Sequence, residues 1–258
     1  MFLKFLYAFF LALSLLLIQA CAPLRSVQGP MQFIDDRLTC SSVPSTLIVM
    51  LPGAYDKPQD FIDHGFVAAV RSRRIDADIR LVDAHISYYT NQQIEHRLED
   101  EIVAPARARG YKRIWFAGIS LGGYGTLLYS AKNPSKLDGF FVMAPYMGSR
   151  NVPAEVQRQG GLRKWSDSRQ GNIDIDLWRS LQGYVTASSA LPPAYLGFGQ
   201  SDRFAEINAL FADVLPRERS FIVPGGHDWS TWKKLWAKFL DAAPLPRIDQ
   251  STHSCTAN

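Results

Sequence analysis

The 258-residue chain lacks the features that mark nucleic-acid-binding, metal-binding and phosphate-binding proteins. Its formal net charge is only +4, and its lysines and arginines are scattered, so we expect no nucleic-acid partner. Its three cysteines lie far apart and no two histidines have helical spacing, which argues against a metal site. No glycine-rich phosphate loop, internal repeat or low-complexity segment occurs, so we expect no nucleotide held in such a loop and no repeat architecture.

The chain also lacks an apolar run long enough to span a membrane. Its main apolar run, residues 5–18, has the length of the hydrophobic core of a signal peptide and follows the positively charged Lys4. We therefore predict that residues 1–20 are a targeting segment and that the folded domain lies outside the cytoplasm.

The end of this segment, Leu17-Ile18-Gln19-Ala20-Cys21, resembles a bacterial lipoprotein signal, in which an aliphatic and a small residue precede a cysteine. The resemblance implies that Cys21 is lipidated and anchors the mature chain in the bacterial cell envelope. By the same resemblance, Ala22 in place of aspartate favours the outer membrane. The alternative is ordinary secretion of a soluble protein, with cleavage near Ala20 or Ala22.

Two cysteines remain if Cys21 is lipidated, namely Cys40 and Cys255. An even number in an oxidising compartment favours a disulfide, which would join the start of the domain to the C-terminal tail. Closing so long a loop could stabilise the fold by about 3–5 kcal/mol. Two free thiols are the alternative, because sequence alone does not place the two Cα atoms within reach.

Strand-like and helix-like segments alternate after Ser45. Short apolar runs predict strands at 46–51, 79–83, 140–143, 194–198 and 219–223, with one more beginning at Arg113. Apolar residues at helical spacing predict helices at 61–73, 92–109, 126–132, 173–181 and 229–242. This alternation predicts an α/β protein with a doubly wound, mostly parallel sheet and helices on both faces. Such sheets bind ligands beyond the carboxyl ends of their strands.

One stretch breaks the alternation. Residues 146–193 separate two predicted strands by far more than the usual connection length. We predict that they form a small cap over the binding edge of the sheet. An ordinary crossover helix with long loops is the alternative.

The most informative motif is Gly118-Ile119-Ser120-Leu121-Gly122, between an apolar strand and a helix. A serine hydroxyl is a weak nucleophile, so it must be exposed at a strand end where a histidine can reach it. The two flanking glycines let strand and helix approach closely around a strained serine backbone. The motif predicts that Ser120 is a catalytic nucleophile.

A base and an orienting acid follow in the order Ser, Asp, His. Asp202 comes directly after one predicted strand, and His227 follows the last strand in Pro224-Gly225-Gly226-His227-Asp228-Trp229. We predict that Asp202 accepts the Nδ1 proton of His227, whose Nε2 takes the proton of Ser120. Asp174, Asp176 and Asp228 compete for the role of the acid, and Asp228 is better suited to cap the helix after it.

An oxyanion hole needs two backbone N–H groups. The residue after the nucleophile, Leu121, should supply one of them. The other should come from the loop Leu51-Pro52-Gly53-Ala54-Tyr55 after the first parallel strand, with Ala54 preferred over Gly53. Five aromatic residues flank the predicted site and are candidates to line it: Tyr55, Tyr124, Tyr146, Phe204 and Trp229.

Over residues 44–243 the chain resembles the α/β-hydrolase family, and more loosely its compact esterases of the esterase D type. The resemblance rests on the Ser120 motif, on Gly226-His227-Asp228-Trp229 and on the strand-end Asp202. It implies hydrolysis of an ester or thioester without a metal or a cofactor. The chain departs from the family in having Pro52-Gly53 where many relatives have His-Gly, and in showing no antiparallel strand pair before Ser45.

The sequence thus predicts four parts: a signal peptide at 1–20, a tether and leading segment at 21–43, a hydrolase domain at 44–243 and a tail at 244–258. The expected function is extracytoplasmic hydrolysis of a small-molecule or acyl ester, with thioester and amide substrates open. One alternative is a non-catalytic envelope lipoprotein that uses the same fold for binding or assembly. Another is an acyltransferase that uses the same three residues.

Overall fold

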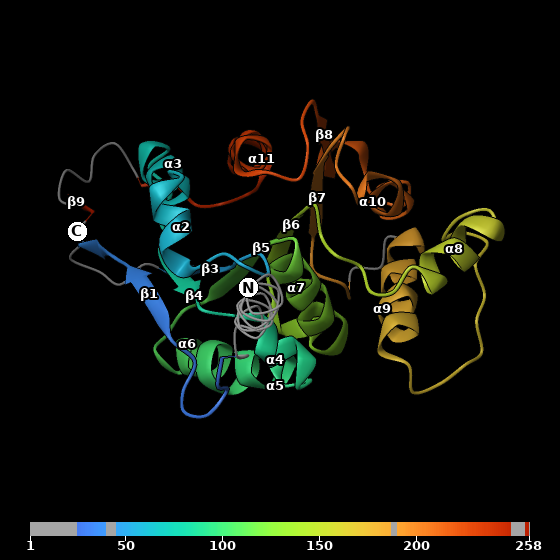
Figure 1. Ribbon diagram of the computed structural model, residues 1–258. Helices are drawn as coiled ribbons and strands as arrows, with labels where there is room; N and C mark the ends of the chain where they lie inside the picture. The colour runs from blue at the N-terminus through green and yellow to red at the C-terminus, as the bar shows by residue number, and fades with distance from the viewer. Residues whose placement is uncertain (1–24, 40–44, 187–189, 249–255, 258) are drawn as a thin grey trace, which may run out of the picture.

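The computed structural model describes residues 25–39, 45–186, 190–248 and 256–257. Seven strands form one sheet in the order β1-β4-β3-β5-β6-β7-β8, and every pair of neighbours is parallel except β1 and β4 (Figure 1). The strands are β1 (Phe33–Asp36), β3 (Thr46–Leu51), β4 (Asp78–Val82), β5 (Arg113–Ile119), β6 (Gly139–Met143), β7 (Ala194–Gly199) and β8 (Ser220–Val223). The predicted doubly wound α/β sheet is therefore confirmed.

The strand order changes direction between β3 and β5. From β3 the chain passes to β4 on one side, then returns to β5 on the other side and continues outward to β8. β3 and β5 are direct neighbours, with Leu51 opposite Gly118 at their carboxyl ends. Open α/β sheets bind ligands at such a switch point, and here it carries both the predicted oxyanion loop and the predicted nucleophile.

Helices cover both faces of the sheet (Figure 1). α2 (Pro58–Asp63), α3 (Phe66–Ser72) and α11 (Trp229–Ala242) lie on one face, while α4 (Ile86–Thr90), α5 (Ile94–Leu98), α6 (Ala104–Ala108) and α7 (Leu121–Lys132) lie on the other. The segment between β6 and β7, which we call the β6–β7 insertion, holds α8 (Asn151–Arg158) and α9 (Ile173–Gln182). α10 (Ala205–Ala212) follows β7.

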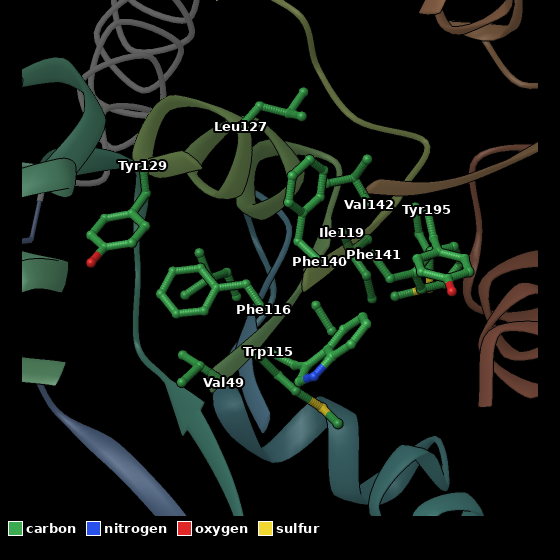
Figure 2. Packing of buried hydrophobic residues seen from close by; sticks show 14 of the residues in the cluster. Val49, Trp115, Phe116, Ile119, Leu127, Tyr129, Phe140, Phe141, Val142 and Tyr195 are labelled. Atoms are coloured by element: carbon green, nitrogen blue, oxygen red, sulfur yellow. The ribbon is translucent and has the colours of Figure 1, made fainter. Parts of the chain in front are cut away.

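The core is rich in aromatic rings (Figure 2). The strands β3, β4, β6 and β7 are buried along their whole length, as expected for a parallel sheet covered on both faces. Phe141 of β6 stacks on Phe239 of α11, with ring centroids 4.6 Å apart and planes 4° apart. On the opposite face Phe116 stacks on Tyr129 of α7 at 5.0 Å. These contacts fix α11 and α7, the two helices that begin next to the predicted site.

Three element predictions were wrong in detail. The helix after the nucleophile begins at Leu121 rather than near residue 126, because close packing of Gly122 and Gly123 outweighs their low helix propensity. The helix predicted at 61–73 is broken at Gly65, whose φ is +79°. The helix predicted at 92–109 contains a π-helical turn, Glu99–Val103, between α5 and α6.

One antiparallel strand, β1, precedes the parallel sheet, although the sequence showed no antiparallel strand pair before Ser45. β1 forms the edge of the sheet and pairs with β4, with Asp35 opposite Arg80. The sequence did not predict this strand because two of its residues, Asp35 and Asp36, are charged. In the structure both carboxylates bind arginines.

The predicted signal peptide, the lipidation site Cys21 and the cysteines Cys40 and Cys255 lie outside the described residues. The structure does pair the short strands β2 (Leu38–Thr39) and β9 (Thr256–Ala257), with Thr39 opposite Thr256. The disulfide stays a prediction. Among the described residues, no helix is long and apolar enough to cross a membrane.

The Arg80–Asp35 ion pair is expected to stabilise the edge of the sheet at neutral pH. Arg80 Nε and Nη2 lie 2.7 and 2.8 Å from the two Asp35 oxygens, and the arginine is only 4% exposed. Burial raises the pKa of Asp35, but hydrogen bonds from Arg80 and Arg37 outweigh burial and hold the pKa below its usual range. Replacing Arg80 by Met leaves the partly buried carboxylate of Asp35 with only the exposed Arg37 as an ionic partner, and we expect a loss of about 3 kcal/mol in unfolding free energy at pH 7.

The sign of the pH dependence follows from the lowered pKa. The pair stabilises the fold above the unfolded pKa of about 4, and this contribution disappears as pH falls through the lower folded value. Urea unfolding at pH 7 and pH 3 should therefore show a smaller Arg80→Met effect at pH 3 than at pH 7. Arg37, which is 57% exposed and binds the same carboxylate, supplies the matched control, with an expected loss below about 1 kcal/mol. Equal losses for the two variants would contradict the assignment.

Candidate active site

Ser120 sits in a sharp turn between β5 and α7. Its φ of +51° and ψ of −110° are unusual for a residue other than glycine. The turn is held by its own backbone: Ser120 N–H donates to the Met143 carbonyl (2.9 Å), and the Ser120 carbonyl accepts from Tyr124 N–H (3.1 Å) and Tyr146 N–H (3.0 Å). Strain that persists because surrounding contacts enforce it is typical of functional sites.

Two glycines permit the close approach of backbone that this turn requires. A Cβ at Gly118 would lie 2.3 Å from the Gly122 carbonyl oxygen, where no side chain fits. A Cβ at Gly122 would lie 2.1 Å from the Leu51 carbonyl oxygen. Gly122 therefore lets the start of α7 touch the end of β3, which brings the predicted oxyanion loop beside Ser120.

The structure brings Ser120, His227 and Asp202 together from three different strand ends. His227 Nε2 lies 2.9 Å from Ser120 Oγ, and His227 Nδ1 lies 2.8 Å from Asp202 Oδ2. The side chain of Asp202 is fully buried and that of His227 is 13% exposed. Asp202 Oδ1 also accepts the N–H of Phe204 at 2.8 Å. A carboxylate can only accept from Nδ1–H, so Nε2 is left free to accept the serine proton.

The competing aspartates have other partners. Asp228 caps α11 by accepting the Thr231 N–H at 2.9 Å, and this bond holds the pKa of Asp228 below its usual range. Asp174 accepts from the Tyr124 hydroxyl at 3.2 Å and from a backbone N–H at 2.8 Å. Asp176 pairs with Arg179. None of these three carboxylates is hydrogen-bonded to His227.

The two segments that carry the predicted oxyanion donors both adjoin Ser120. Leu121 is the first residue of α7, where N–H groups have no acceptor within the helix. Across from it, the loop after β3 is closed by a bond from Asp56 N–H to the Gly53 carbonyl (3.2 Å). A Cβ at Gly53 would lie 3.8 Å from Ser120 Cβ, so this loop touches the nucleophile. The assignment of Ala54 as the second donor remains a prediction.

Two aromatic rings contact the His227 ring. Phe204 and Trp232 meet the His227 ring edge-on at 5.3 and 5.1 Å. Tyr146 links Phe204 to Tyr124 through ring contacts of 6.0 and 5.2 Å. Of the residues that the sequence suggested as lining, Tyr55 differs, since it is 94% exposed.

Two residues near the site, Trp232 and Asp56, were not predicted from the sequence. Trp232 carries a helical-spacing signal, three residues after Trp229 on α11, whereas Asp56 has no sequence signal beyond its place in the loop. In the part of the chain that the structure describes, no group of three or more His, Cys, Asp or Glu side chains could hold a metal ion.

No family model and no curated protein matches the chain in sequence. Solved structures match it in fold. FphF, a fluorophosphonate-binding serine hydrolase of Staphylococcus aureus, superposes with a TM-score of 0.58 at 17% identity, covering 83% of this chain and 98% of its own. S-formylglutathione hydrolase (FrmB) of the same organism gives 0.58 at 17% identity, covering 85% and 98%. Est1E of Butyrivibrio proteoclasticus gives 0.58 at 16% identity, covering 83% and 93%. The chain therefore has the α/β-hydrolase fold.

Proposed function

We propose that this protein is a serine hydrolase that cleaves a carboxylester or a thioester through an acyl-enzyme. The observation that carries the proposal is the hydrogen-bonded chain from Ser120 through His227 to Asp202, at 2.9 and 2.8 Å. A nucleophile, a base and an orienting acid in this arrangement are the recognised requirements for acyl transfer. The structures that share its fold include two named as hydrolases, which supports the same reaction class.

The reaction follows from the geometry. Ser120 Oγ attacks the carbonyl carbon while its proton passes to His227 Nε2, and the carbonyl oxygen becomes negatively charged. The N–H groups of Leu121 and Ala54 bind this oxygen. The tetrahedral adduct then expels the alcohol or thiol, which receives the proton from His227, and an acyl-serine remains. Water then attacks the acyl carbon while His227 takes its proton; the bond to Ser120 Oγ breaks, the acid leaves, and His227 returns the proton to Ser120. Asp202 stabilises the imidazole whenever it is charged.

The proposal includes a place in the cell. The sequence signal at Leu17 to Cys21 supports export across a bacterial inner membrane and a lipid anchor on Cys21. In that setting the domain would act on esters of the envelope or the periplasm, with soluble secretion as the alternative. The β6–β7 insertion, which packs α9 against α7, is proposed to act as the cap over the site.

The test is the intact mass of the mature domain after treatment with a fluorophosphonate. Wild type is expected to gain one adduct, because an activated serine displaces fluoride from phosphorus. Ser120→Ala and His227→Ala are expected to gain none while keeping their circular dichroism spectra. A folded wild type that gains no adduct would favour the non-catalytic binding protein, and product analysis with added alcohols would separate acyl transfer from hydrolysis.

A further inference from the structure

The carboxylate of Asp56 lies close to the predicted nucleophile, Ser120. Among the described residues it forms no ion pair. It lies in the loop after β3, and a Cβ at Gly53 would lie 2.4 Å from Asp56 Oδ2 and 3.8 Å from Ser120 Cβ. The carboxylate and the serine thus both lie close to the point where a side chain at position 53 would begin. Only glycine at position 53 allows this approach, since any side chain there would displace the carboxylate.

The Asp56 side chain is held in place. The indole N–H of Trp229 donates to Asp56 Oδ1 at 3.3 Å. Trp229 is itself fixed, because it stacks on His64 with ring centroids 4.3 Å apart and planes 11° apart, and meets Phe61 edge-on at 5.6 Å. A carboxylate oriented by a packed tryptophan is preorganised for a ligand, unlike a surface aspartate that moves freely.

The charge of Asp56 is poorly compensated within the chain. Among the described residues no ion pair includes Asp56, although Lys57 follows it directly in sequence. Burial is the main cause that raises the pKa of Asp56, and the negative charge of Asp60 adds to it. Hydrogen bonds from Trp229 and the Gly53 backbone, together with the nearby His64, act in the opposite direction without reversing the shift. Half-buried charges are usually paired, so an unpaired one calls for an explanation from outside the chain.

The position of this carboxylate conflicts with the proposed reaction of a neutral ester. Acyl transfer develops a negative charge on the carbonyl oxygen of the substrate. The proposed donor to that oxygen, the N–H of Ala54, lies in the same loop as Asp56. Two negative charges this close repel each other, which slows the reaction. A positive charge on the substrate removes the conflict, because it neutralises Asp56 and lies close to the developing oxyanion.

We propose that Asp56 selects substrates that carry a cationic group, such as an ammonium, close to the scissile carbonyl. This inference rests on the proposed function, since it concerns the specificity of the same site. Trp229 acts as the positioning residue for the carboxylate, and Asp56 itself contacts the substrate cation.

The test compares two boronic acids of the same shape, 3-(trimethylammonio)phenylboronic acid and 3-tert-butylphenylboronic acid. Ser120 Oγ adds to boron, its proton passes to His227, and the boron becomes tetrahedral and negatively charged, as the oxyanion does. Inhibition constants are measured by protection of Ser120 against fluorophosphonate labelling, so no substrate is needed. Wild type is expected to bind the cationic compound about tenfold more tightly than its neutral isostere.

Asp56→Asn supplies the decisive comparison. It should lower the ratio of the two inhibition constants severalfold, by weakening the cationic compound and strengthening the neutral one. The preference that remains in the variant reflects the electron-withdrawing ammonium, which makes the boron a stronger Lewis acid. A structural role for Asp56 would weaken both compounds together. The matched control is Asp63→Asn, on the adjacent helix α2, where the side chain is exposed and binds only Gln59; it should keep the wild-type ratio.

A second measurement needs no variant. If the preference arises from charge, raising the salt concentration should lower the ratio for wild type while leaving the neutral inhibitor unchanged. A wild-type ratio near one, or a ratio that is the same in wild type and Asp56→Asn, overturns the inference while the proposed function stands. Absence of fluorophosphonate labelling in folded wild type instead overturns the proposed function, and the inference with it.

Discussion

Removing the Ser120 hydroxyl, the His227 imidazole or both is expected to lower kcat for an activated ester by about the same factor, on the order of 10⁶. The two side chains share one hydrogen bond of 2.9 Å and perform one step, since the histidine is useful only while it takes the serine proton. Once either is lost, the other contributes nothing further. The residual rate should come from binding and from the oxyanion donors, which neither substitution removes.

The measurement is steady-state hydrolysis of a 4-nitrophenyl ester by wild type, Ser120→Ala, His227→Ala and the double variant. Ser201→Ala and His96→Ala are the matched controls, because both side chains are exposed and lie outside the hydrogen-bonded chain. They should retain full activity. Losses in the two single variants that multiply in the double variant would mean that the residues act independently, which the proposed mechanism does not allow.

Sequence reasoning succeeded where the chemistry imposes a local pattern. The strand, turn and helix around Ser120 follow from an apolar run and from glycines that alone fit the backbone contacts at Gly118 and Gly122. The histidine was identified by its place after the last strand, among five histidines in the chain. The carboxyl ends of parallel strands meet at one edge of the sheet. The position of each residue directly after a strand was therefore enough to predict that they lie close together.

It failed where the decisive partner is distant in sequence. β1 is stabilised by Arg80, 45 residues away from Asp35, and its charged residues gave no strand signal. The carboxylate of Asp56 is oriented by a hydrogen bond from Trp229, which follows it by 173 residues. The π-helical turn at Glu99–Val103 likewise interrupts a helix whose apolar spacing looked continuous. Pairwise contacts of this kind leave no periodic trace in one sequence.

Asp202→Asn is expected to lower kcat by about 10⁴ while leaving the fold intact. The reason lies in the second hydrogen bond of this carboxylate. Asp202 Oδ1 accepts the Phe204 N–H at 2.8 Å, so the carbonyl oxygen of an asparagine must take that position. Its amide NH₂ then faces His227 Nδ1 and donates to it. The imidazole is forced to carry its proton on Nε2, and it can no longer accept a proton from Ser120.

Asp228→Asn is the matched control for this substitution, made on the second aspartate that adjoins the base. Asparagine caps helices as well as aspartate does, so α11 should keep its N-terminus and the enzyme its activity. Kinetics of both variants at pH 7, with thermal unfolding to verify the fold, separate the two carboxylates. If Asp228→Asn lost more activity than Asp202→Asn, the assignment of Asp202 as the acid that orients His227 would be wrong. If neither lost activity, the tautomer of His227 would have to be fixed by another group, although its Nδ1 lies 2.8 Å from Asp202.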